Sequence, residues 1–182
     1  MQRHVEPGAR VLEIAAGSGE HAIFFAPRLQ VDAWQPTDLD PEARVSIDAW
    51  REEAGAERVR AALALDATSE TWPVTSVDVV VCINMIHVAP WSACEGLIRG
   101  AARVLEASER GGLLFMYGPY KRGGVHTAAS NEAFDASLRS RDASWGVRDL
   151  DAVTALAEGA GFSTRDVAPM PANNFSVVFS RS

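Results

Sequence analysis

The sequence is poor in cysteine and has no long apolar run. Its 182 residues include two cysteines, Cys82 in an apolar run and Cys94 on an expected helix. They offer no disulfide framework and suit a reducing, cytoplasmic compartment. No segment approaches the roughly 20 apolar residues of a membrane span, so no membrane association is expected. The four histidines and two cysteines lack metal-ligand spacing, which predicts no metal site.

Clusters of basic residues are also missing. The net charge is −7 and the pI is about 5.1, and the densest basic patch is only Lys121 and Arg122. A surface that neutralises phosphates needs more basic residues than this, so nucleic acid is not an expected partner. With 47% hydrophobic residues, the chain is long enough for one domain with a buried core, spanning 1–182, and too short for two.

Short apolar runs alternate with longer amphipathic segments, the pattern of β-α units that build a parallel sheet. The expected strands are Arg10–Ile14, Val31–Pro36, Val59–Leu65, Val77–Asn84, Gly111–Gly118, Phe162–Pro169 and Phe175–Ser180. The expected helices are Gly19–Leu29, Pro41–Gly55, Trp91–Ala107, Asn131–Arg141 and Asp149–Ala160, with a loop-helix insertion at about 119–148. The last two strands are too close in sequence for a helical crossover, which predicts an antiparallel hairpin.

The stretch VLEIAAGSGEHAIFFA (residues 11–26) joins a strand to a helix through the G-x-G turn of Gly17 and Gly19. Glycine lets the backbone approach a ligand closely, as in dinucleotide-binding folds. Glu13 argues against a pyrophosphate, because a carboxylate at a strand end is costly to desolvate unless it accepts hydrogen bonds from the loop backbone or faces a cation. A ligand with an ammonium group and a sulfonium centre is a better partner.

Acidic residues follow the next two expected strands. Asp38 comes 21 residues after Gly17, and an acid at that distance can reach the two ribose hydroxyls of an adenosine. Asp40 competes with it, and either residue could instead cap the next helix. Asp66 is a candidate acceptor for an adenine amino group.

These residues, with the segments EIAAGSGEHA, WQPTDLD, CINMIHVAPW, YGPY and MPANN, resemble the class I S-adenosylmethionine-dependent methyltransferases, and among them a methyltransferase-like family labelled as a domain of unknown function. The resemblance implies a Rossmann-like α/β fold whose mostly parallel seven-stranded sheet has the order 3-2-1-4-5-7-6 and an antiparallel last strand. It implies S-adenosylmethionine as cofactor. The implied cofactor-binding residues are Glu13, Ala15, Gly17, Gly19, His21, Asp38, Leu39, Asp66, Ala67, Asn84 and Met85. The family usually carries a lid-forming segment before the first strand; here about nine residues precede it, so either the start is short or it lies upstream.

The carboxyl ends of neighbouring parallel strands meet at one edge of a sheet, so the segments NMIHVAP and YGPY are expected together beside the methyl donor. His87 is the candidate base, because an ordinary imidazole is neutral near pH 7; a structural role is equally open. The expected catalytic residues are His87, Tyr117 and Tyr120. The expected substrate-binding residues are His87, Tyr120, Asn131, Trp145, Asn173 and Asn174. The loop from Lys121 to Ser130 is expected to fold over this site.

The leading interpretation is a methyltransferase that acts on a small molecule, as a monomer or a homodimer. A non-catalytic module that binds S-adenosylmethionine or S-adenosylhomocysteine is the second, because a fold does not by itself establish catalysis. An NAD(P)-dependent oxidoreductase is the third, and it leaves Glu13 unexplained.

Overall fold

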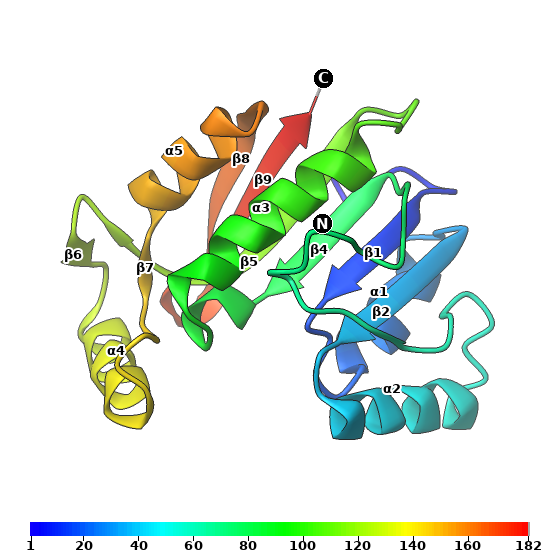
Figure 1. The fold of residues 1–182 in the computed structure, drawn as a ribbon, viewed down its shortest axis with the longest axis horizontal. Coiled ribbons are helices and arrows are strands. Elements are labelled where there is room, and N and C mark those ends of the chain that lie inside the picture. Colours follow the sequence, from blue (N-terminus) through cyan, green and yellow to red (C-terminus); the bar gives the residue numbers. More distant parts are fainter. Residues whose placement is uncertain (182) are drawn as a thin grey trace.

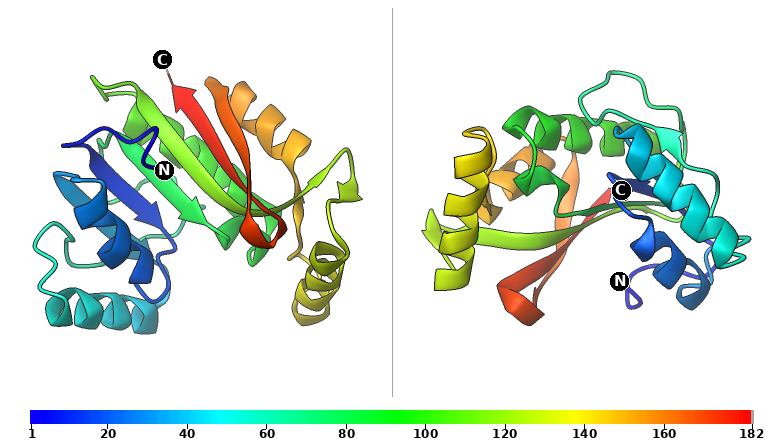
Figure 2. Two further views of the ribbon diagram at one scale, coloured as in Figure 1. Left: turned by 180° about the vertical axis from the view of Figure 1, so that it is seen from behind. Right: turned by 90° about the horizontal axis from the view of Figure 1, so that it is seen from below.

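Nine strands form the central sheet, and helices lie on both of its faces (Figures 1 and 2). The computed structural model describes residues 1–181. The strands are β1 (Arg10–Ile14), β2 (Ala33–Asp38), β3 (Leu63–Ala64), β4 (Val79–Ile83), β5 (Gly112–Arg122), β6 (Val125–His126), β7 (Arg148–Asp149), β8 (Phe162–Met170) and β9 (Asn174–Arg181). The helices are α1 (Glu20–Arg28), α2 (Pro41–Glu53), α3 (Trp91–Leu105), α4 (Ala129–Arg141) and α5 (Leu150–Gly159), with 3₁₀ turns η1 (Met85–His87) and η2 (Pro171–Asn173).

The strand order is β3-β2-β1-β4-β5-β9-β8, which confirms the predicted order once the last two strands are numbered six and seven. Strands β1 to β5 pair in parallel along this path, whereas β9 is antiparallel to both β5 and β8. The short strands β6 and β7 pair with the end of β5 and were not expected from the sequence.

The two faces of the sheet have separate apolar cores because side chains alternate along each strand. Leu12 and Ile14 of β1 face α3 and α5, while Val11 faces α1. Strand β4 is buried on both faces, as its nearly continuous β-branched run predicts. On the α1 face, no helix within residues 1–181 covers β5, β9 and β8 (Figure 2).

Several strands differ in length from the prediction, and the structure shows a cause for β3 and for β5. The expected strand Val59–Leu65 is reduced to β3 and a single bridge between Val59 and Trp34, because Asp48 of α2 takes the N–H of Ala62 at 2.9 Å. Strand β5 continues past Gly118 to Arg122, where β6 and β7 pair with it. Within residues 1–181, no helix is long and apolar enough to cross a membrane.

Candidate functional site

The glycine loop between β1 and α1 has left-handed backbone at Ala15, Gly17 and Gly19, with φ values of 55°, 59° and 89°. A Cβ atom added at Gly17 would meet nothing within 4 Å, so open space lies beside the backbone there. A Cβ at Gly19 would lie 2.9 Å from Cα of Ile47 in α2. Gly19 is therefore required for helix packing, whereas Gly17 leaves room for a ligand.

Asp38 ends β2 directly beside this loop. Its Oδ2 accepts a hydrogen bond from the backbone N–H of Gly17 at 2.9 Å, and its Oδ1 accepts one from Asp40 at 2.9 Å. Asp40 is the N-cap of α2, since its side chain accepts from the N–H of Glu42. The two acids thus have different roles: Asp40 caps a helix, and Asp38 holds the loop. Leu39 between them is exposed.

The other expected cofactor residues lie along the same edge, because β3, β2, β1 and β4 are neighbours. Asp66 is exposed and accepts bonds from the backbone N–H and the hydroxyl of Thr68 at 2.8 and 2.7 Å, which is turn geometry. Ala67 is buried against α3. Asn84 follows β4 with left-handed backbone at φ 61° and an exposed side chain, and Met85 next to it is buried.

The sequence suggested that Glu13 could accept hydrogen bonds from the loop backbone, but its side chain does not face that backbone. Its side chain is 1% exposed and belongs to the α1 face, because Leu12 and Ile14 on either side face α3. Oε2 accepts a hydrogen bond from Nε1 of Trp34 at 2.8 Å, and Oε1 lies 3.4 Å from Nδ1 of His21. The interaction with Glu13 raises the pKa of His21, against the opposing effect of burial.

His87 and Tyr120 are in the core and do not border a cleft. Both are 0% exposed, and their rings pack edge to face with centroids 5.2 Å apart. Nδ1 of His87 accepts from the N–H of Arg148 at 3.3 Å, and Nε2 points at Gly118, where an added Cβ would lie 2.5 Å away. Burial, with a contribution from the charge of Arg148, lowers the pKa of His87 to about 3, so the ring is neutral.

The expected substrate asparagines connect α4 to the turn between β8 and β9. Asn131 is buried and donates to the carbonyl of Asn173 at 3.0 Å and to the hydroxyl of Thr127 at 3.1 Å. The Asn173 amide in turn donates to Ser130 at 3.2 Å. These contacts attach α4, within the insertion at about 119–148, to the sheet. Trp145 lies next to Arg141, whose guanidinium carbon is 5.1 Å from the ring centroid.

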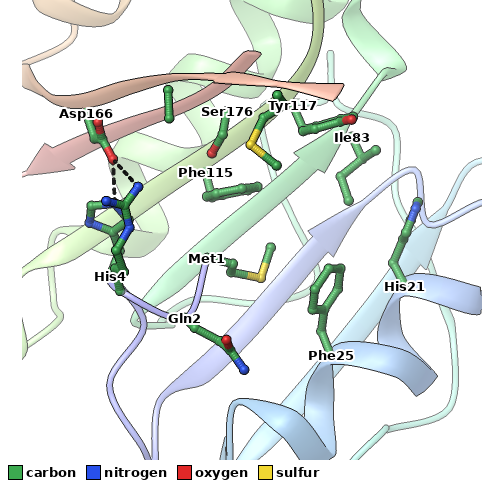
Figure 3. Close-up of a pocket in the computed structure, with 13 residues that line it drawn as sticks. Met1, Gln2, His4, His21, Phe25, Ile83, Phe115, Tyr117, Asp166 and Ser176 are labelled. Atoms are coloured by element: carbon green, nitrogen blue, oxygen red, sulfur yellow. Dashed lines mark hydrogen bonds and ion pairs between the residues drawn. The ribbon is translucent and has the colours of Figure 1, made fainter. Parts of the chain in front are cut away.

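A cavity of about 550 Å³ lies instead on the uncovered part of the α1 face; we call it the α1-face cleft. Its floor is a row of residues in register across β4, β5, β9 and β8: Ile83, Tyr117, Ser176 and Ala168. Phe115 lies two residues before Tyr117 on the same face, and His21 and Phe25 of α1 form one wall (Figure 3). The Tyr117 hydroxyl accepts from Nδ2 of Asn174 at 3.1 Å.

The far end of the α1-face cleft carries charged residues that the sequence analysis missed. Nε2 of His4 lies 2.9 Å from Asp166 (Figure 3), and Arg3 lies 3.6 Å from the same carboxylate. No local pattern connects these residues, since 162 positions separate His4 from Asp166. The alternation in GLLFMYG could have placed Phe115 and Tyr117 on one face. Within residues 1–181, no group of three or more side chains has the arrangement of a metal site.

Solved structures share this fold at low sequence identity. An O-methyltransferase family 2 protein from Planctomyces limnophilus, in complex with apigenin, matches with a TM-score of 0.81 and 19% identity over 97% of this chain and 52% of its own. An O-methyltransferase family protein from Burkholderia thailandensis matches with a TM-score of 0.82 and 17% identity over 96% and 51%. The YcgJ protein from Bacillus subtilis matches with a TM-score of 0.72 and 20% identity over 97% and 91%.

The chain spans about half the length of the first two proteins, and identities this low relate the folds alone. The family relationship comes from a different comparison. The model of the family described as "Protein of unknown function (DUF938)" matches residues 1–181, and the chain belongs to that family.

Proposed function

We propose that this protein is a methyltransferase that uses S-adenosylmethionine to methylate a small molecule. The observation that carries the proposal is the junction of the glycine loop with β2, where Gly17 leaves open space and donates its N–H to Asp38. Within residues 1–181, the second oxygen of Asp38 accepts from a single backbone N–H, and a carboxylate oxygen has further lone pairs for ribose hydroxyls. The resemblance of the fold to methyltransferases supports the same reading.

The residues along this edge fit the parts of such a cofactor. Asp38 would bind the ribose, and the exposed Asp66 would accept from the adenine amino group. The backbone at Ala15 and Gly17 would approach the amino-acid portion, with Asn84 on its other side. The bound cofactor supplies a methyl group on a sulfonium centre, and the chain has to bind it, align the acceptor and exclude water.

The α1-face cleft is the proposed acceptor site. Its floor and wall combine apolar residues with the hydroxyls of Tyr117 and Ser176 and with the ring of His21. Volumes of this size hold small organic ligands. The net charge of −7 disfavours nucleic acid as the acceptor. We expect a cytoplasmic monomer or homodimer, in which Cys82 and Cys94 stay reduced because burial raises the pKa of both thiols.

Titration calorimetry of the purified protein with S-adenosylmethionine, S-adenosylhomocysteine and NAD tests the cofactor. We expect saturable binding of the first two and none of NAD. Binding of NAD alone would favour an oxidoreductase, and binding without turnover of any acceptor in a metabolite panel would favour a non-catalytic binding module. Absence of binding by S-adenosylmethionine would refute the proposal.

A further inference from the structure

Glu13 and His21 form an ordered pair at the rim of the α1-face cleft. The indole N–H of Trp34 holds one oxygen of the Glu13 carboxylate at 2.8 Å, and the other oxygen lies 3.4 Å from Nδ1 of His21. Since Nδ1 faces Glu13, Nε2 lies on the opposite side of the ring. The His21 side chain is 44% exposed, and within residues 1–181 the buried Oε1 of Glu13 has no hydrogen-bond partner, so His21 is the cation that faces it. A buried acid thus orients an accessible imidazole.

The position of His21 connects the two parts of the proposed site. It is the second residue of α1 and follows Gly19 of the glycine loop by two positions. It also lines the α1-face cleft, together with Ile83 at the carboxyl end of β4 and its partner Tyr117 on β5 (Figure 3). A group at this point can contact an acceptor in the cleft while the loop beside it holds the methyl donor.

We infer that His21 is the catalytic base that takes the proton of the acceptor, with Glu13 as the residue that positions it; this rests on the proposed function. The acceptor heteroatom forms a bond to the methyl carbon as the carbon–sulfur bond breaks, and that bond's electron pair stays on sulfur. The proton leaves the heteroatom for Nε2 of His21 and passes later to water. The negative charge of Glu13 beside Nδ1 favours the tautomer with its proton on Nδ1, which keeps the lone pair of the neutral ring on Nε2.

The charges around His21 favour this role. Two carboxylates raise the pKa of the ring, Glu13 from β1 more strongly and the exposed Glu20 from α1 itself less strongly. The other charged groups that line the cleft are the amino group of Met1 and the side chains of Arg3, His4 and Asp166. Arg3 and His4 each pair with Asp166 at the far end. His87, by contrast, is fully buried with a pKa of about 3 and is too weakly basic for the task.

Histidine NMR of the ligand-free protein tests the interaction between Glu13 and His21 without relying on activity. The pKa of His21 should fall in Glu13→Gln, which removes the buried charge while keeping the shape of the side chain. Glu20→Gln is the matched control, because it removes an exposed carboxylate from the same turn, and the shift should be smaller since water screens that charge. Equal shifts in the two variants, or no shift in Glu13→Gln, would overturn the inference.

Two matched acceptor probes test the proton transfer. Both 2-naphthol and 2-naphthalenethiol suit an apolar cleft, and the thiol is largely ionised at neutral pH whereas the naphthol is not. Both probes should perturb the NMR signals of His21 on binding. His21→Gln should lower naphthol turnover by about a hundredfold or more and thiol turnover by no more than about threefold. Parallel losses for the two probes, unchanged naphthol turnover, or no contact of either probe with His21 would each refute a base at this position.

Calorimetry with S-adenosylmethionine separates this inference from the proposed function. The donor affinities of the unaltered protein and of His21→Gln are measured first, because the sequence also predicts His21 as a cofactor-binding residue, and turnover is then compared with the donor at saturation. If the unaltered protein fails to bind the donor, the proposed function fails. If donor binding is normal and thiol turnover is measurable while naphthol turnover survives in His21→Gln, only the base assignment fails.

Discussion

Lowering the pH should destabilise this protein through one residue, His87. The ring is fully buried, and burial lowers its pKa to about 3 in the folded state, whereas an unfolded chain has a histidine pKa near 6.5. Between these values the unfolded state binds a proton that the folded state does not. The free energy of unfolding therefore falls as the pH drops below about 6.5, with a slope of about 1.4 kcal/mol per pH unit, and the loss ends near the folded-state pKa of about 3.

The size of the effect follows from this slope. Between pH 7.5 and pH 5.0, His87 should remove about 2 kcal/mol from the free energy of unfolding. Urea unfolding followed by the fluorescence of the five tryptophans measures it at both pH values. His87→Asn provides the reference, because the asparagine oxygen can replace Nδ1 as the acceptor for Arg148 but does not titrate. Other titrating groups cancel when the two pH dependences are subtracted.

The protein with His87 should thus lose about 2 kcal/mol more than His87→Asn over this pH range. Equal losses would mean that His87 is protonated at pH 5 in the folded state, which requires its ring to be solvated. Such a result would contradict the packing of the ring against Gly118 and Tyr120. It would also restore His87 as a residue that a ligand could reach.

The remaining predictions concern the cofactor edge and the insertion. Asp38→Ala should weaken S-adenosylmethionine binding by about 1 to 3 kcal/mol in calorimetry, while Asp40→Ala, which removes a helix cap, should leave it intact; the reverse pattern would exchange their roles. Gly17→Val should abolish that binding while costing about 1–2 kcal/mol of stability from its left-handed backbone, and normal binding would move the ligand elsewhere. Asp135→Asn should lower the free energy of unfolding by about 3 kcal/mol, because Lys121 and three further donors lose a buried carboxylate. Thermal melting measures the loss, and the control Asp142→Asn, at an exposed aspartate, should show a much smaller change.

The fold followed from the sequence wherever one segment carried the whole signal. The β-branched run of β4 predicted a strand buried on both faces, and the few residues between β8 and β9 predicted their antiparallel pairing. Strand β3 could not be bounded in this way. Its pairing ends where Asp48, fourteen residues earlier, takes the N–H of Ala62, and no local propensity encodes that competition.

The candidate site was likewise predictable only where the signal lies within one stretch of the sequence. The spacing between Gly17 and Asp38 predicted that Asp38 reaches the ribose of a ligand at the glycine loop. The structure brings the two residues together in a hydrogen bond of 2.9 Å, and the contact with a ribose stays a prediction. The burial of His87 depends on Gly118 and on the backbone of Arg148, which lie far away in sequence. The residues next to His87 in the sequence do not show whether such partners exist, so the exposure of His87 could not be predicted.

Glu13 shows why one acidic residue can serve two neighbouring sites. Its backbone leads into the glycine loop at the edge of the sheet, so its position in the sequence marks the proposed cofactor site. Its side chain obeys the alternation of β1 and lies on the α1 face, in register with Val81 and through it with Phe115 in the floor of the cleft. The carboxylate therefore acts on that face, where Trp34 fixes it and His21 contacts it. A donor bound at the edge and an acceptor bound on the face would then meet at His21, the residue that is adjacent to both.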